Sequence, residues 1–286
     1  MTSRRTHVVI PVQPWFADHC FNGKVVLPAV ETMLLLAAGV AETYPEIDIR
    51  VMDDVRFSRF LGIPEGSAGM EALIEYEENE NGSIRVTLLS RRQFAGMSRL
   101  EEHGGILFSS PRAQSGSCGP TYATVCPADP ETTIPAERVY RELVPFGLSY
   151  HTLREALHLS GQCAWGRLKA PASQTPADGI RESIGSPFPL DGAFHAACVL
   201  GQRSTDFVPF PVGLGRRIIL SPTQPGGDYG TRVELVTATR DELVFDLTIF
   251  DDTGRICECV TGLRMRDVSG GRIKPPEWIR EGNKSA

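Results

Sequence analysis

One long apolar helix followed by four strand-like segments is a pattern that this chain shows twice. Apolar residues at helical spacing predict the first helix over residues 30–42 and the second over residues 191–201. Each helix is too short to cross a bilayer, which needs about 20 apolar residues, so its apolar surface must pack against neighbouring strands. The sequence therefore predicts an α+β chain of two similar halves that does not enter a membrane.

The strand-like segments are rich in β-branched and aromatic residues and are bounded by turn signals such as Asn81-Gly82. In the first half they cover residues 48–60, 70–76, 84–90 and 98–108. In the second half they cover residues 155–159 and 164–170 before the helix, and 208–220, 231–239, 243–250 and 255–266 after it. Strands joined by short turns pair antiparallel, so we expect antiparallel sheets in both halves.

A change of composition separates the two halves. Residues 109–135 are rich in Ser, Gly, Pro and Thr and show little periodicity, which is typical of a linker. We therefore predict an N-terminal half over residues 1–108 and a C-terminal half over residues 136–270, which opens with a short helix. Residues 271–286 form a tail in this division.

The overall charge argues against a nucleic-acid partner. The 286 residues carry a formal net charge of −6 at pH 7, whereas nucleic-acid-binding surfaces are strongly basic. Three groups of arginines could form a local basic patch, although paired arginines are typical of a solvated surface. They are Arg91 with Arg92, Arg216 with Arg217, and Arg264 with Arg266.

The cysteines and the N-terminus bear on metal binding and on location. Seven cysteines, an odd number with no Cys-x-x-Cys pair and no His/Cys cluster, indicate reduced thiols and no metal site. The first residues carry charge but lack the apolar core of a signal peptide. We therefore expect a cytoplasmic protein that binds no metal.

Chemistry-bearing residues stand directly before the first helix, in His19-Cys-Phe-Asn-Gly23-Lys-Val-Val-Leu-Pro28. A histidine titrates near neutral pH and can serve as a general base. Gly23 allows close approach to its backbone N–H, which favours a developing negative charge. Pro28 fits the first turn of a helix, where a missing N–H breaks no bond. The alternative is that His19 is a structural loop residue.

The second helix carries an acid and a histidine in Pro189-Leu-Asp191-Gly-Ala-Phe-His195. Residues four apart share one face of a helix, so a contact with His195 would orient the Asp191 carboxyl. A plainer interpretation is that Asp191 caps the helix N-terminus, where aspartate is among the preferred residues.

Taken together, the spacings His19-x-x-x-Gly23-x-x-x-x-Pro28 and Asp191-x-x-x-His195 resemble two family signatures. They are the H-x-x-x-G-x-x-x-x-P and D-x-x-x-Q/H motifs of the dehydratase domains of modular polyketide synthases and polyunsaturated fatty-acid synthases. The resemblance implies a double hot-dog fold, in which two antiparallel sheets each wrap around a long helix.

Other segments extend the resemblance over nearly the whole chain. Residues 139–150, which end in Gly147-Leu-Ser-Tyr150, look like the segment leading into the family's G-x-x-Y-G-P motif, and residues 244–266 look like its C-terminal hairpin. After Tyr150 the chain has His151-Thr152 where the family usually has Gly-Pro. This region shapes the substrate tunnel in the family, so we expect an altered substrate preference. His151 is either an exposed loop residue or a third polar group at the site.

The resemblance implies dehydration of a 3-hydroxyacyl thioester carried on the phosphopantetheine of an acyl carrier protein, in polyketide or fatty-acid biosynthesis. His19 would remove the C2 proton, and Asp191 would protonate the departing hydroxide. The residues that would position the acid and the substrate are His195, Gly23, Pro28 and Tyr150. A backbone amide near Gly23 would stabilise the charge on the thioester oxygen. This chemistry needs no redox cofactor and no metal. The implied partners are the carrier protein, other synthase domains and a second copy of the chain.

Three alternatives remain open at this point. A double-bond isomerase or a cyclase would use the same base and acid. A catalytically silent module would bind the carrier protein without chemistry. A thioesterase with Cys20 as nucleophile is disfavoured, because adjacent residues of an extended segment point to opposite faces and His19 would not reach it.

Overall fold

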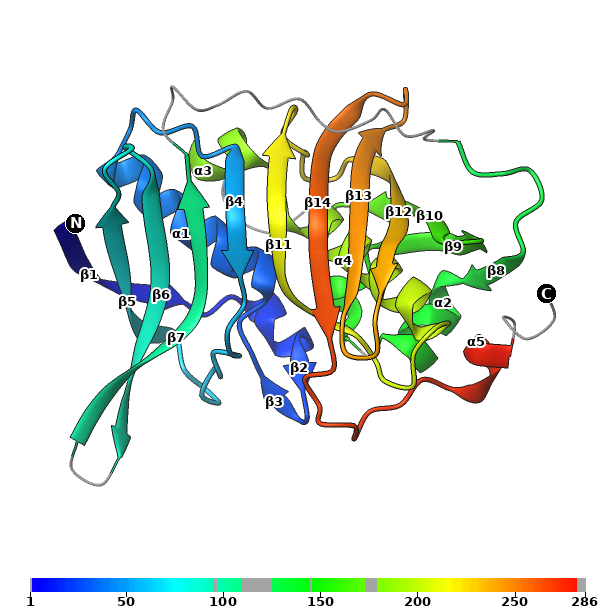
Figure 1. Cartoon of the computed structure of the whole chain (residues 1–286), viewed down its shortest axis with the longest axis horizontal. Helices are drawn as coiled ribbons and strands as arrows, with labels where there is room; N and C mark the ends of the chain where they lie inside the picture. The colour runs from blue at the N-terminus through cyan, green and yellow to red at the C-terminus, as the bar shows by residue number, and fades with distance from the viewer. Residues whose placement is uncertain (1, 95–96, 110–124, 145, 173–178, 282–286) are drawn as a thin grey trace.

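In the computed structural model twelve of the described strands form one continuous antiparallel sheet (Figure 1). The structure describes residues 2–94, 97–109, 125–144, 146–172 and 179–281. The strands of the N-terminal half lie in the order β1 (Thr2–Pro11), β5 (Gly69–Glu78), β6 (Ile84–Phe94), β7 (Met97–Phe108) and β4 (Val51–Arg56). Those of the C-terminal half continue as β11 (Phe210–Ile219), β14 (Ile256–Arg266), β13 (Leu243–Asp251), β12 (Asp228–Ala238), β10 (Cys163–Lys169), β9 (Leu153–Ser160) and β8 (Thr132–Pro135).

The two predicted sheets are joined edge to edge. β4 of the N-terminal half pairs antiparallel with β11 of the C-terminal half, with Val55 opposite Leu214. Both of these residues are fully buried, so the junction belongs to the core. The hairpin β13–β14 expected from the family resemblance is present as an antiparallel pair beside β11.

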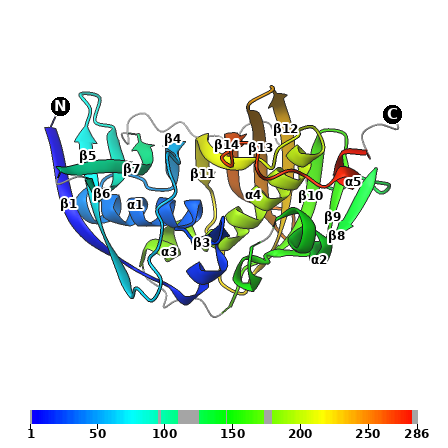
Figure 2. The same cartoon turned by 90° about the horizontal axis from the view of Figure 1, so that it is seen from below.

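Each half wraps its part of the sheet around one long helix. α1 (Ala29–Thr43) packs against β6 and β7, whereas α4 (Pro187–Gln202) packs against β9, β10, β12 and β13. The two helices also contact each other, and Figure 2 shows both of them on the same side of the sheet. Every residue of α4 is buried. This arrangement confirms the predicted double hot-dog fold.

The second helix begins at Pro187 rather than at Asp191, with Ser186 as its N-cap. Pro187 and Pro189 both fall in the first turn, whose N–H groups have no partner within the helix. The prolines therefore cost no hydrogen bond, and the predicted helix start at residue 191 was wrong. Asp191 lies in the second turn, so helix capping does not explain it.

Short elements connect these layers. They are the 3-10 helices η1 (Pro14–Asp18) and η4 (Leu148–Tyr150), the hairpin strands β2 (Cys20–Phe21) and β3 (Lys24–Val25), the helix α2 (Ala136–Arg138) with the π-helical turn η3 (Val139–Leu143), and the helices α3 (Gly179–Ile184) and α5 (Glu277–Glu281).

The predicted linker and tail both contain regular structure. Residues 132–135 of the linker form β8, which pairs with β9 at the edge of the sheet, and residues 110–124 lie outside the described part of the chain. In the tail, α5 places Trp278 beneath the guanidinium of Arg138, 3.6 Å from the ring centroid. Its neighbour Ile279 is buried, so α5 is packed onto the C-terminal half.

Two further expectations concern thiols and membranes. Cys259 is disulfide-bonded, which corrects the expectation of reduced thiols, because an odd total does not prevent a pair from forming. The free cysteines of the described residues are Cys20, Cys126, Cys163, Cys198 and Cys257. Among the described helices, none combines the length and the apolar character that a membrane crossing requires.

Candidate active site

His19 lies in the loop between η1 and β2 and is 8% exposed. Its Nδ1 is 3.2 Å from the carbonyl oxygen of Val26. A carbonyl only accepts, so in the neutral ring Nδ1 carries the proton and Nε2 is the basic nitrogen. The imidazole stacks on Phe146, with ring centroids 4.4 Å apart and planes inclined by 10°. Burial lowers the pKa of His19, and the opposing charge of Asp191 offsets part of this effect.

Asp191 and His195 lie one turn apart on α4, as their spacing predicts. Asp191 Oδ2 and His195 Nε2 are 3.0 Å apart, and both side chains are buried. The ring N–H is not aligned with the oxygen well enough for a regular hydrogen bond. His195 Nδ1 lies 3.4 Å from the hydroxyl of Tyr140, which accepts the backbone N–H of Leu153 at 2.8 Å. When Tyr140 donates its proton to Nδ1, the proton of the neutral His195 ring sits on Nε2, beside Asp191.

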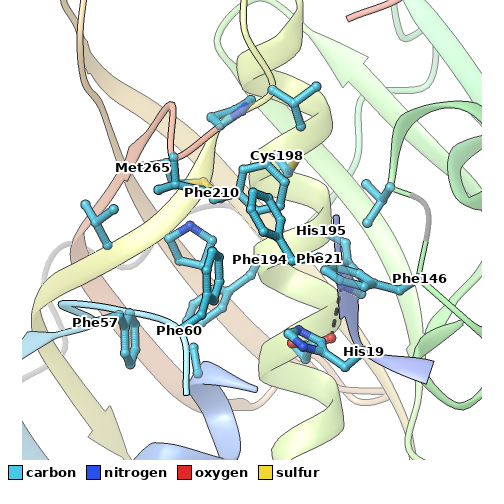
Figure 3. Close-up of a pocket in the computed structure, with 18 of the residues that line it drawn as sticks. His19, Phe21, Phe57, Phe60, Phe146, Phe194, His195, Cys198, Phe210 and Met265 are labelled. Atoms are coloured by element: carbon cyan, nitrogen blue, oxygen red, sulfur yellow. Dashed lines mark ion pairs between the residues drawn. The ribbon is translucent and has the colours of Figure 1, made fainter. Parts of the chain in front are cut away.

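A cavity of about 650 Å³ brings the predicted base and acid together. His19 reaches its wall from the N-terminal half, whereas Asp191, His195 and Cys198 reach it from successive turns of α4. Figure 3 shows the rings of His19 and His195 in this cavity, with the contact between Asp191 and His195 drawn as a dashed line. Neither half alone holds both groups, so the site exists only where the two halves meet.

Aromatic side chains form much of the remaining wall (Figure 3). Phe21 of β2 packs against Phe60, with ring centroids 4.6 Å apart, and against Phe210 of β11 at 5.1 Å. This cluster again joins the two halves. An apolar wall of this kind excludes water and strengthens the electrostatic interactions of groups inside the cavity.

Asp18 connects the loop of His19 to the other half. Its carboxylate oxygen Oδ2 accepts the backbone N–H of Ser149 at 2.9 Å, and its carbonyl accepts the N–H of Gly147 at 2.8 Å. A β-carbon at Gly147 would overlap the Asp18 side chain, so this approach requires glycine. Because Phe146 precedes Gly147 and stacks on His19, these contacts fix the wall behind the base.

Two other predicted site residues lie near the base without lining the cavity. Tyr150 is fully buried behind His19, with ring centroids 5.2 Å apart, and its hydroxyl has no hydrogen-bond partner among the described residues. Burial and the charge of Asp191 raise its pKa, so the hydroxyl keeps its proton. Pro28 is the N-cap residue of α1 and is buried.

The structure does not bring Gly23 to the cavity. It is exposed in the turn between β2 and β3, where Asn22 and Gly23 both have positive φ values of 50° and 73°. The left-handed backbone of this tight turn explains the glycine without a role in charge stabilisation.

His151 also stays outside the cavity wall. Its ring stacks on Tyr140, with centroids 4.0 Å apart, and its Nε2 donates to the carbonyl of Phe146 at 2.9 Å. Thr152 is buried against Gly192 of α4, whose missing side chain makes room for it. The His151-Thr152 segment thus packs behind the acid and its neighbour His195.

Asp18, Tyr140 and Phe146 are site residues that the sequence interpretation did not select. They lie within or beside the segments that were singled out. Their contacts join residues more than a hundred positions apart or depend on ring stacking, and a local sequence pattern shows neither. As to metals, the described residues contain no group of three or more His, Cys, Asp or Glu side chains arranged to hold an ion.

Comparisons with known proteins show to which family the chain belongs. The family model described as "Polyketide synthase dehydratase N-terminal domain" matches residues 123–273, more than half of the chain. A second model, "Polyketide synthase dehydratase domain", matches residues 4–91. The polyketide synthase ThaG of Burkholderia thailandensis is 25% identical over an alignment of 269 residues that covers 91% of this chain. That protein is far longer, and the chain spans 4% of its length.

Solved structures share the fold. A dehydratase domain of a trans-AT polyketide synthase from Brevibacillus brevis aligns with a TM-score of 0.73 at 17% identity, covering 93% of this chain and 94% of that one. The dehydratase domain from the CurJ module of the curacin synthase gives 0.68 at 19% identity, with 92% of each chain covered. A bifunctional dehydratase-cyclase domain of ambruticin biosynthesis gives 0.68 at 17%, covering 92% of this chain and 91% of that one. With the family model matching more than half of its length, the chain belongs to the polyketide synthase dehydratase domain family.

Proposed function

We propose that this chain eliminates water from a 3-hydroxyacyl thioester to give the 2-enoyl thioester. The observation that carries the proposal is that His19 and Asp191 reach one apolar cavity from opposite halves. A β-elimination is assisted by a base at C2 and an acid at the C3 hydroxyl, and two groups facing one substrate provide both.

His19 Nε2 is the base in this mechanism. Its Nδ1–H is held by the Val26 carbonyl, which leaves the Nε2 lone pair to take the C2 proton. The lowered pKa keeps the ring neutral, and therefore able to accept a proton, at pH 7. As the C2–H bond breaks, its electron pair forms the C2–C3 double bond and the C3–O bond breaks.

Asp191 is the acid. Its carboxyl proton passes to the departing hydroxyl, so that water leaves and Asp191 becomes a carboxylate. His195 Nε2 is 3.0 Å from Asp191 Oδ2, close enough for its N–H to stabilise the carboxylate as the negative charge develops. The cycle closes when the proton on His19 returns to Asp191. The reaction is redox-neutral, so the proposal requires neither a redox cofactor nor a metal.

The substrate carrier in this proposal is the phosphopantetheine arm of an acyl carrier protein. It is supported by the similarity to ThaG, described as a polyketide synthase, of which this chain matches a small part. Other synthase domains and a second copy of this chain are proposed as further partners, and the cytoplasm as the location.

Mass spectrometry of carrier-bound products tests the proposal. A panel of 3-hydroxyacyl thioesters loaded on a carrier protein should lose the mass of one water when the protein is added. An isomerase or a cyclase acting without dehydration would leave the mass unchanged while altering the product's structure. If the masses of all substrates and their structures stay unchanged, the chain is a catalytically silent module and the proposal is wrong.

A further inference from the structure

Arginines of the β6–β7 hairpin lie next to the cavity without belonging to the catalytic site. Figure 1 shows this hairpin projecting from the body of the molecule. Arg92 of β6 stands opposite Arg99 of β7, and directly opposed residues share one face of a strand pair. Both are exposed.

The same face of the hairpin leads to the cavity wall. On this face, Ser90 and Glu101 are the next opposed pair after Arg92 and Arg99. Ser90 contacts Nε2 of the cavity residue His103 at 2.7 Å. Glu101 accepts from Arg92 at 3.2 Å and from Arg59 at 3.5 Å. Arg59 is itself a cavity residue and is 65% exposed, so the cavity reaches the surface there.

Arg59, Arg92 and Arg99 form what we call the arginine face. Glu101 pairs with Arg59 and Arg92, and Glu102 accepts from Ser58 beside Arg59, so the three guanidinium groups exceed the two nearby carboxylates by one positive charge, in a chain of net charge −6. The cavity also reaches exposed residue Lys274 near the C-terminal part of α4, but there Asp206 lies 3.7 Å from the Lys274 amine and balances it. The two openings therefore differ in charge.

The side chains that line the cavity also differ between the two openings. Toward the arginine face it includes the polar side chains Thr32, Ser58 and His103, which suit the amides of a pantetheine arm. Toward Lys274 most of the lining side chains other than Glu142 are apolar, which suits an acyl chain. These are Leu143, Val144, Cys198, Val208, Met265 and Ile273.

We propose that the arginine face binds the phosphodiester of the phosphopantetheine arm, so that the arm enters beside Arg59 and the acyl chain points along α4 toward Cys198. The inference rests on the proposed function for the identity of the substrate. Guanidinium groups pair with phosphate oxygens in a fixed geometry, and an excess of positive charge at the opening attracts the anion before it binds. Phe60, at 42% exposure beside Arg59, adds an apolar contact at the same opening.

The test compares phosphopantetheine with pantetheine, which lacks the phosphate, in titrations followed by NMR. The wild type should bind phosphopantetheine about five- to tenfold more tightly than pantetheine, as expected for two exposed ion pairs. In the double variant Arg92→Ala with Arg99→Ala this preference should disappear, and pantetheine affinity should stay unchanged. Lysine at both positions should restore part of the preference.

Arg5→Ala is the matched control, because Arg5 is also an exposed arginine of the N-terminal half and pairs with a single glutamate, Glu75. It should bind both ligands as the wild type does. Equal affinity of the wild type for the two ligands, or an unchanged preference in the double variant, would overturn the inference. Because binding is read without turnover, a wild type that shows the preference but forms no enoyl product would count against the proposed function alone.

Discussion

His19 is prepared for its role by two contacts of its own ring. The Val26 carbonyl fixes which nitrogen is basic, and the stack on Phe146 fixes the plane of the ring. Both contacts act on the neutral imidazole, which is also the form that burial favours. Burial, and not the Val26 hydrogen bond, keeps the base unprotonated, because that bond by itself raises the pKa of His19.

The pH dependence of activity follows from this burial. Protonated His19 cannot accept the C2 proton, so activity falls at acid pH as the ring titrates. Because burial lowers the pKa of His19 below 6.5, the acid limb of kcat/KM should have its midpoint below pH 6.5. The measurement is a pH profile on one carrier-bound substrate. A midpoint at or above pH 6.5 would show that this ring is not the titrating base.

At the scale of single elements, the packing of η4 against the loop of His19 depends on the close approach of Gly147 to Asp18. Gly147→Ala should push η4 away from Asp18, because the new methyl group would overlap the Asp18 side chain. We expect a loss of about 1–3 kcal/mol in the free energy of unfolding, the usual range for overpacking, and a fall in kcat as Phe146 shifts behind the base. Denaturant unfolding and turnover measure the two effects.

Gly62→Ala is the control for this substitution, since nothing lies within 4 Å of a β-carbon built there. It should change the unfolding free energy by no more than about 0.5 kcal/mol. A Gly147→Ala variant as stable and as active as Gly62→Ala would refute the proposed contact.

The segment after Tyr150 is the second element with a testable role. His151 holds its ring against Tyr140 and its Nε2 against the Phe146 carbonyl, outside the cavity wall. His151→Ala should therefore reduce turnover by about tenfold at most, far less than the 10²–10⁴-fold typical of a general acid or base. Restoring Gly-Pro at positions 151 and 152 should change the preferred acyl length or branching and leave dehydration intact. A loss as deep as that of His19→Ala would place His151 in the catalytic set.

The elements show why some features were predictable and others were not. The helix of residues 29–43 and the strands of the hairpins follow directly from apolar periodicity and turn residues such as Asn81-Gly82. The start of α4 was missed because Pro187 and Pro189 are typical of loops, although the first helical turn tolerates them. Local sequence patterns do not encode the contact of Asp18 with Ser149, which brings together residues 131 positions apart.

At the scale of the whole molecule, the joined sheet makes the two halves one unit. The junction between β4, β11 and β14 contains a buried ion pair, Arg217 Nε to Glu258 Oε2 at 2.8 Å, with 4% and 0% of the side chains exposed. Arg217→Met would leave the Glu258 carboxylate without its counter-charge. We expect a loss of about 3–5 kcal/mol in the free energy of unfolding, measured with denaturant.

Adding Glu258→Leu should recover much of that loss, since an apolar pair replaces a buried ion pair at little net cost. Both variants should unfold in a single transition, because the sheet runs unbroken through the junction. Two separate transitions would contradict this account of the interface. So would an Arg217→Met variant that is as stable as the wild type.

The assignment of base and acid across the cavity is tested most directly by turnover of a carrier-bound 3-hydroxyacyl thioester, followed by mass spectrometry. We compare the wild type with His19→Ala and Asp191→Asn and record thermal melting of all three. Each substitution should lower turnover by about 10²–10⁴-fold while the melting temperature stays nearly unchanged. Normal turnover by either variant would contradict the role assigned to that residue, and normal turnover by both would contradict the mechanism.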